Sequence, residues 1–108
     1  MAWSAYRNAI QMAEDDFGVA LKFNLRGFKV SPQDSIKFIF KTNKNDDPPL
    51  LEKEYTNIVN NVVYLKFTQA DSLLFPPGSY LYSLDWYKDG VFQCNIIPSA
   101  PFKVVDKA

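Results

Sequence analysis

Apolar and polar residues alternate along most of the chain, and this period of two is typical of β-strands with one buried face. The longest alternating run is 79–87, where every second side chain is large and apolar. Similar runs predict strands over 19–25, 35–42 and 62–67. Residues 50–56 are expected to form a short, less hydrophobic strand at a sheet edge, and 91–97 and 102–105 a return strand and a short last strand. Seven or so short strands in about 100 residues predict an all-β fold, an antiparallel sandwich of two facing sheets.

Residues that cannot continue a β-ladder mark the predicted breaks between strands. Pro32 lacks an amide hydrogen, so residues 31–34 are expected to form a turn. Asp89-Gly90 between two alternating runs is a strong hairpin signal. Near the C-terminal end, Pro98-Ser99-Ala100-Pro101 is expected to interrupt the return strand and leave two short strands on either side.

The segment 68–75 lacks this alternation and is expected to hold a single turn of helix. Asp71 is predicted to cap the turn, and Pro76-Pro77 to end it. Gly78 then gives the backbone the freedom to make a corner before the strand at 79–87.

The N-terminal segment fits two structures. Apolar residues at three- and four-residue steps suit an amphipathic helix, but Glu14-Asp15-Asp16 would place anions at its C-terminal end, which the helix dipole disfavours. The same stretch equally suits a short strand. We therefore expect a strand near 9–13, preceded by an N-terminal arm of residues 1–8, with residues 9–108 forming a single domain.

The composition excludes several classes of partner. The chain has 108 residues, 47% hydrophobic and 16% aromatic, which is enough apolar area for one core. Twelve basic and twelve acidic side chains give zero net charge without a basic cluster, so we expect no nucleic-acid partner. No run approaches the roughly 20 apolar residues of a membrane span, so we expect no membrane partner. The start lacks a charged leader followed by a long apolar run, which predicts no signal peptide.

Catalytic chemistry has few candidates in this sequence. Histidine is absent, which removes His-based acid–base catalysis, His-activated nucleophiles and the usual zinc and iron sites. Cys94 is the single cysteine, so one chain forms no disulfide and no thiolate metal cage. No pair of carboxylates is singled out for glycoside hydrolysis. We therefore expect no enzyme, with no catalytic residues, no cofactor and no metal site.

Large aromatic residues are the remaining candidates for function. Trp86, Tyr87 and Phe92 surround the predicted hairpin and fall on both of its faces, which would leave one face for a partner. Ordinary packing between the sheets is the other explanation. Trp3 and Tyr6 are too large to be left in water, and dock either on this domain or on a neighbouring copy. These five residues are the interface candidates.

Tyr80 and Tyr82 lie next to the predicted corner. They fit a sugar-stacking surface or, as the alternation favours, the core. In the core, one tyrosine is expected to tie its hydroxyl to the backbone of the corner.

Three charged segments are interpreted first as solvated surface. Asp46-Asp47, with Asn43 and Asn45, offers oxygen ligands for calcium, although acidic residues beside Pro-Pro usually make an exposed turn. Glu52-Lys53-Glu54 and Glu14-Asp15-Asp16 are expected to be solvated charges.

Two sets of motifs run in order along the chain. In the first half, Val30-Ser31-Pro32 precedes the strand Ser35-Ile36-Lys37-Phe38-Ile39-Phe40-Lys41. In the second half, Pro77-Gly78-Ser79-Tyr80-Leu81-Tyr82-Ser83-Leu84-Asp85-Trp86 precedes Asp89-Gly90 and then Phe102-Lys103-Val104. Over about residues 9–106, this order resembles the immunoglobulin-like N-terminal module of phage baseplate upper proteins and small phage virion proteins of the same type.

The resemblance implies an immunoglobulin-like, antiparallel β-sandwich of about seven strands, with a short helical turn before the Pro-Pro-Gly corner. It also implies a non-enzymatic phage or prophage virion structural protein, a baseplate or tail component, made in the bacterial cytoplasm. Its expected partners are copies of itself, as a homo-oligomer, and other virion proteins. Zero net charge suits such assembly because little self-repulsion opposes it.

The alternative is a carbohydrate-binding β-sandwich module that contacts host glycans through exposed aromatics, and a glycan partner is expected in that case alone. A coplanar row of exposed aromatic rings beside polar groups would favour the glycan. Aromatics covered by a second copy would favour assembly.

Overall fold

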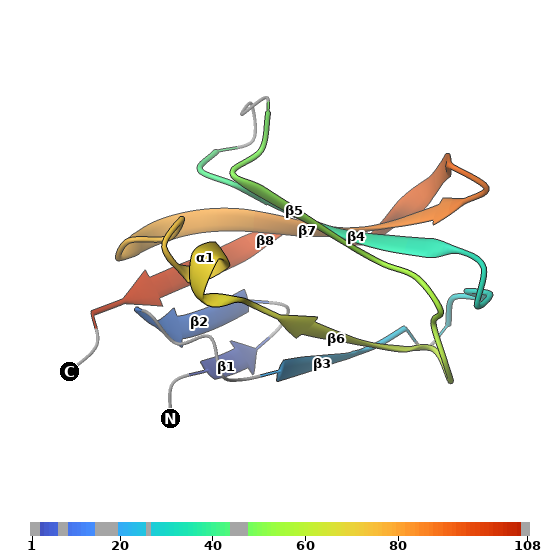
Figure 1. Ribbon diagram of the computed structural model, residues 1–108, viewed down its shortest axis with the longest axis horizontal. Helices are drawn as coiled ribbons and strands as arrows, with labels where there is room; N and C mark the ends of the chain where they lie inside the picture. The colour runs from blue at the N-terminus through green and yellow to red at the C-terminus, as the bar shows by residue number, and fades with distance from the viewer. Residues whose placement is uncertain (1–2, 7–8, 15–19, 26, 44–47, 107–108) are drawn as a thin grey trace.

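The computed structural model shows a fold built from two facing β-sheets (Figure 1). It describes residues 3–6, 9–14, 20–25, 27–43 and 48–106, and for residues 3–6 the backbone alone. The larger sheet has six strands in the order β1-β2-β8-β7-β4-β5, and the smaller sheet pairs β3 with β6. The elements are β1 Trp3–Tyr6, β2 Ala9–Ala13, β3 Ala20–Asn24, β4 Ser35–Lys41, β5 Leu51–Tyr55, β6 Val62–Lys66, α1 Gln69–Ser72, β7 Gly78–Lys88 and β8 Val91–Val105.

The prediction of an all-β sandwich with a short helical turn is confirmed. The described part of the chain has eight strands, and all its strand pairs but one are antiparallel. The exception is β2, which matches the strand predicted at 9–13 and pairs in parallel with β8, so that Ile10 lies opposite Phe102. Residues 3–6 of the predicted arm form β1, an edge strand antiparallel to β2.

Phe40 of β4 lies at the centre of an aromatic core between the two sheets. Its ring centroid is 5.2 to 5.5 Å from those of Phe67, Phe75 and Phe102, and 6.1 Å from that of Tyr82. Most of these rings meet edge to face, the arrangement that aromatic pairs prefer. Because the partners follow β6 and α1 or belong to β7 and β8, one cluster holds the larger sheet against the smaller one.

β8 runs as one strand through Pro98 and Pro101, and the prediction that this segment separates two strands was wrong. Up to residue 101 β8 pairs with β7 alone, and β2 joins it from Phe102 onward. Proline has no backbone N–H to donate. On the free edge of a strand no neighbouring strand needs that donor, so proline costs the sheet little stability there. The ladder with β7 absorbs the irregularity through register shifts between Tyr82 and Tyr87.

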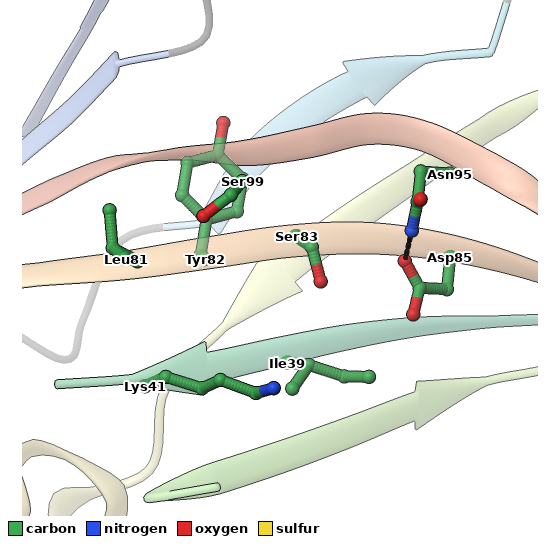
Figure 2. Close-up of a pocket in the computed structure, with 8 residues that line it drawn as sticks. All are labelled: Ile39, Lys41, Leu81, Tyr82, Ser83, Asp85, Asn95 and Ser99. Carbon is green, nitrogen blue, oxygen red and sulfur yellow. Dashed lines mark hydrogen bonds between the residues drawn. The ribbon is translucent and has the colours of Figure 1, made fainter. Parts of the chain in front are cut away.

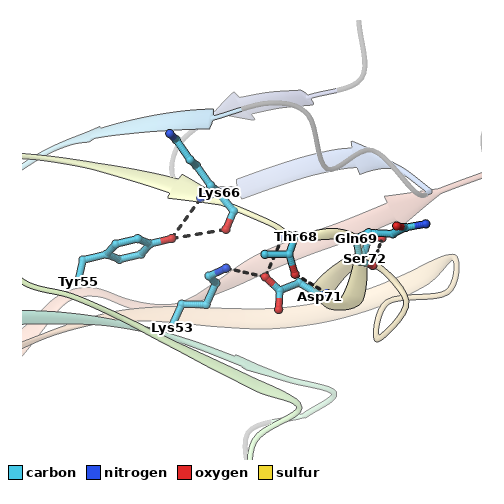
Figure 3. A network of polar contacts seen from close by, with 7 residues as sticks. All are labelled: Lys53, Tyr55, Lys66, Thr68, Gln69, Asp71 and Ser72. Atoms are coloured by element: carbon cyan, nitrogen blue, oxygen red, sulfur yellow. Dashed lines mark hydrogen bonds and ion pairs between the residues drawn. The ribbon is translucent and has the colours of Figure 1, made fainter.

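Side chains, in place of backbone pairing, connect β5 with β6 and α1 (Figure 3). The Lys53 ammonium lies 2.5 Å from the Asp71 carboxylate, and its side chain is 17% exposed. The hydroxyl of Tyr55 accepts a hydrogen bond of 3.2 Å from the backbone N–H of Lys66. The prediction that Lys53 is a solvated charge was therefore wrong, because its register opposite Phe38 turns the side chain inward.

Thr68, and not Asp71, is the N-cap of α1. Its hydroxyl accepts from the backbone N–H of Asp71, and the Asp71 carboxylate accepts in return from the backbone N–H of Thr68. This capping box satisfies two helix-end donors at once. Burial raises the pKa of the Asp71 carboxyl, but the hydrogen bonds from Lys53 and Thr68 outweigh it, so that the pKa is lowered overall.

Candidate functional site

The candidate site lies on the face of the larger sheet that points away from β3 and β6, which we call the outer face. It is formed by the alternate residues of β4, β5, β7 and β8 that do not enter the core. The register places Lys37 opposite Asp85, and Asp85 opposite Asn95 on the next strand. In the same way Ile39 lies opposite Ser83. Residues from separate parts of the chain thereby meet on one surface.

A hollow of about 290 Å³ opens on this face (Figure 2). Three strands line it, and the residues are Ile39, Lys41, Leu81, Tyr82, Ser83, Asp85, Asn95 and Ser99. It lies where β7 and β8 shift register, between Tyr82 and Asp85. The hollow therefore combines aliphatic walls with hydroxyl, amide, ammonium and carboxylate groups.

Asp85 is the most unusual of these residues, because it is 7% exposed although it faces away from the core. The amide of Asn95 donates a 2.5 Å hydrogen bond to its carboxylate. Burial raises the pKa of the Asp85 carboxyl, and the smaller opposing effects of the hydrogen bonds from Asn95 and Ser83 do not cancel it. Of the three polar residues that are buried in the described part of the chain, Asp85 is the one that lines this hollow.

The β7–β8 hairpin carries an aromatic pair on the outer face. Tyr87 and Phe92 lie opposite each other in the ladder, with ring centroids 5.7 Å apart and planes at 71°. The Lys37 ammonium lies 4.5 Å from the centroid of the Tyr87 ring and 3.3 Å from the Glu52 carboxylate. At the tip, Val91 is 61% and Phe92 49% exposed. The hairpin therefore exposes apolar surface to solvent, next to the ion pair of Lys37 and Glu52.

Trp86 faces the opposite way, toward the core, where it packs edge to face on Phe28. Its indole Nε1 donates a 2.9 Å hydrogen bond to the Asp34 carboxylate. The backbone N–H of Ser31 donates to the same carboxylate, and Lys88 lies 3.6 Å away. The hydrogen bond from Ser31 is the main cause that lowers the pKa of Asp34. Burial raises this pKa, but Trp86 and Lys88 lower it further, so the pKa is lowered overall.

The two tyrosines at the corner belong to the core, as the alternation predicted. Tyr82 is 1% exposed, and its burial raises the pKa of its hydroxyl above the ordinary range. Tyr80 donates its hydroxyl hydrogen to the carbonyl of Pro76 at 2.5 Å. The predicted bond between a tyrosine hydroxyl and the corner backbone is therefore present.

Two of the five interface candidates, Trp3 and Tyr6, have side chains outside the described residues, although their backbone forms β1. Asp46-Asp47 and Asn45, the main ligands of the hypothetical calcium site, also lie outside them. Within the described ranges, no group of three or more Cys, Asp or Glu is placed to hold a metal ion.

Sequence reasoning did not single out Asp85, Asn95 and Ser83 as site residues. The available signal was weak: a carboxylate in the second half of the longest alternating strand, on the less apolar of its two faces. Its burial depends on β4 and β8 lying on either side, which alternation does not reveal.

Compared with protein-family models, curated proteins and solved structures, the chain matches none. Over the residues that the structure describes, no helix is long and apolar enough to span a membrane.

Proposed function

We propose that this chain is a non-enzymatic structural protein, and that its outer face and β7–β8 hairpin form contacts with copies of itself and with other proteins. The exposed apolar tip of the hairpin is the observation that carries this proposal. Val91 and Phe92 are 61% and 49% exposed, on a two-stranded projection that rises from the sheet (Figure 1). Exposed aromatic residues on such a surface are typical centres of protein interfaces.

The biological setting that we propose is a phage or prophage virion, as a baseplate or tail component. Its support is the order of sequence motifs that resembles the baseplate module, together with zero net charge, which leaves little repulsion between copies. The β-sandwich class agrees with that resemblance but is shared by many unrelated proteins.

Protein contact is favoured over the glycan alternative by the geometry of the aromatic pair. A sugar ring stacks on a flat platform, whereas the planes of Tyr87 and Phe92 lie at 71° to each other. Trp86 is turned toward the core and is bonded to Asp34, so it adds nothing to such a platform.

Light scattering at increasing protein concentration tests the proposal. We expect the mass to rise above that of one chain, and Phe92→Ser to weaken this association at least tenfold, since losing an aromatic hot spot costs about 2 kcal/mol or more. Leu73→Ser is the matched control, because Leu73 is 71% exposed beside α1. A single-chain mass at all concentrations would contradict self-association. An equal loss of association in Leu73→Ser and Phe92→Ser would show that the hairpin is not the contact.

A further inference from the structure

Among the residues that the structure describes, no cation lies close enough to Asp85 to form an ion pair. The ion pairs within the described residues join Lys37 to Glu52, Lys53 to Asp71, and Lys88 to Asp34, and none includes Asp85. Lys37 is opposite Asp85 in the ladder but is held by Glu52 and the ring of Tyr87. Lys41 lines the same hollow and attracts the carboxylate from a greater distance.

A buried carboxylate in this condition is costly, because burial removes its water and no cation from the described part of the chain replaces that water. The raised pKa of Asp85 expresses this imbalance: the loss of water outweighs the hydrogen bonds from Asn95 and Ser83 and the attraction of Lys41. A positive group that entered the hollow would supply the missing partner.

The remaining lining matches a guanidinium better than an ammonium. Beside the carboxylate, the hydroxyls of Ser83 and Ser99 and the amide oxygen of Asn95 provide several hydrogen-bond acceptors. A guanidinium has five N–H donors in one plane and holds its water weakly, so it satisfies several acceptors at a small cost. The aliphatic side chains of Ile39 and Leu81 suit the three-carbon stem of arginine.

We propose that the outer-face hollow receives an arginine side chain from a partner protein, with the guanidinium against the Asp85 carboxylate. This inference rests on the proposed function, in which the outer face is a contact surface. The hairpin tip with Val91 and Phe92 supplies apolar contact, and the hollow supplies the charge-specific anchor.

Titration with N-acetyl-arginine amide, followed by the backbone amide signals of Ser83, Asp85 and Asn95 in NMR spectra, tests the hollow without a partner. We expect saturable shifts with a dissociation constant in the millimolar range. N-acetyl-citrulline amide, which has the same shape without the charge, should bind at least tenfold more weakly. Equal binding of both probes, or no saturable shift with the arginine probe, would overturn the inference.

Variants separate the roles of the charges. Asp85→Asn keeps the shape of the side chain and should weaken arginine binding at least tenfold. Glu54→Gln is the matched control, since it removes one negative charge from an exposed residue of the same face and should change binding less than twofold. Lys41→Met removes the competing cation and should strengthen binding several-fold; weaker binding would contradict the assigned role of Asp85.

Failure of this inference differs from failure of the proposed function. The titration reports on the hollow of a single chain, whereas light scattering of Phe92→Ser reports on assembly through the hairpin. Association without probe binding would overturn the arginine anchor and leave the contact surface in place.

Discussion

The indole of Trp86 donates a 2.9 Å hydrogen bond to the carboxylate of Asp34, which lies 52 residues earlier in the chain. This bond ties the turn at residues 31–34 to the C-terminal part of β7. Asp34 is 3% exposed, so its negative charge depends on the donors that surround it. The alternation of side chains along β7 directs Trp86 inward and its neighbour Tyr87 outward, and the bond to Asp34 holds the indole in place.

Trp86→Phe should destabilise the fold by about 1–3 kcal/mol, because it leaves a buried carboxylate with one donor fewer. Ser31 and Lys88 remain as partners of Asp34, which places the expected loss toward the lower end of that range. Urea unfolding measures the change. Tyr64→Phe is the control, since Tyr64 is 50% exposed, and a loss no larger than in this control would contradict the role of the bond.

Asp71→Asn should destabilise the fold by about 1–3 kcal/mol, because it removes the ion pair with Lys53 and weakens the capping box. The lowered pKa gives this contribution a pH dependence. It is complete above the ordinary value of 3.8 and is lost as the pH falls through the lower folded value. Urea unfolding between neutral and acid pH should therefore show a smaller acid loss in Asp71→Asn than in the native chain.

The control for Asp71 is Glu52→Gln, which breaks the ion pair with Lys37 on the outer face. That pair is more exposed, so we expect a change below about 1 kcal/mol. Equal changes in the free energy of unfolding in the two variants would show that the ion pair between β5 and α1 stabilises the fold no more than an exposed pair does.

Asp85→Asn should stabilise the protein at neutral pH, although Asp85 is buried and hydrogen-bonded. Burial raises its pKa, so the folded state binds this proton more tightly than the unfolded chain. Stability therefore falls as the pH rises from 3.8 through the raised value, and the asparagine variant escapes this loss.

Urea midpoints of Asp85→Asn and the native chain, compared across pH, check the sign. The gain should shrink as the pH falls toward 3.8, where the native carboxyl also becomes neutral. Acid effects at Asp34 and Asp71 are common to both proteins and cancel in the difference. A variant that is less stable at neutral pH would show that the charge is well solvated in the fold.

Alternation along the sequence correctly identified the buried face of the central strands. Tyr82 and Leu84 were expected inside and are 1% and 0% exposed. The hairpin at Asp89-Gly90 is also present, with both residues at positive φ, as a tight turn between two twisted strands requires. These features depend on residues that are close together in the sequence, so the sequence pattern alone reveals them.

The candidate site was predicted only in part. Tyr87 and Phe92 were named from the sequence, and the structure places them together on the outer face. Asp85 and Asn95 are ten residues apart and come within hydrogen-bond distance through the shifted register of β7 and β8. Because two prolines lie within β8, the sequence predicted a break there, and it did not predict the continuous pairing of β7 with β8 that forms the hollow.

The sequence by itself determined the strand class, the inner face of the central strands and the tight turns, because these follow from the period of the side chains and from local backbone freedom. The tertiary structure alone decided that Lys53 pairs with Asp71, that Asp34 binds Trp86, and that Asp85 is buried on the outer face. Each of these outcomes depends on which distant strands become neighbours. The free energy of a polar group is set by those neighbours and by the water they exclude.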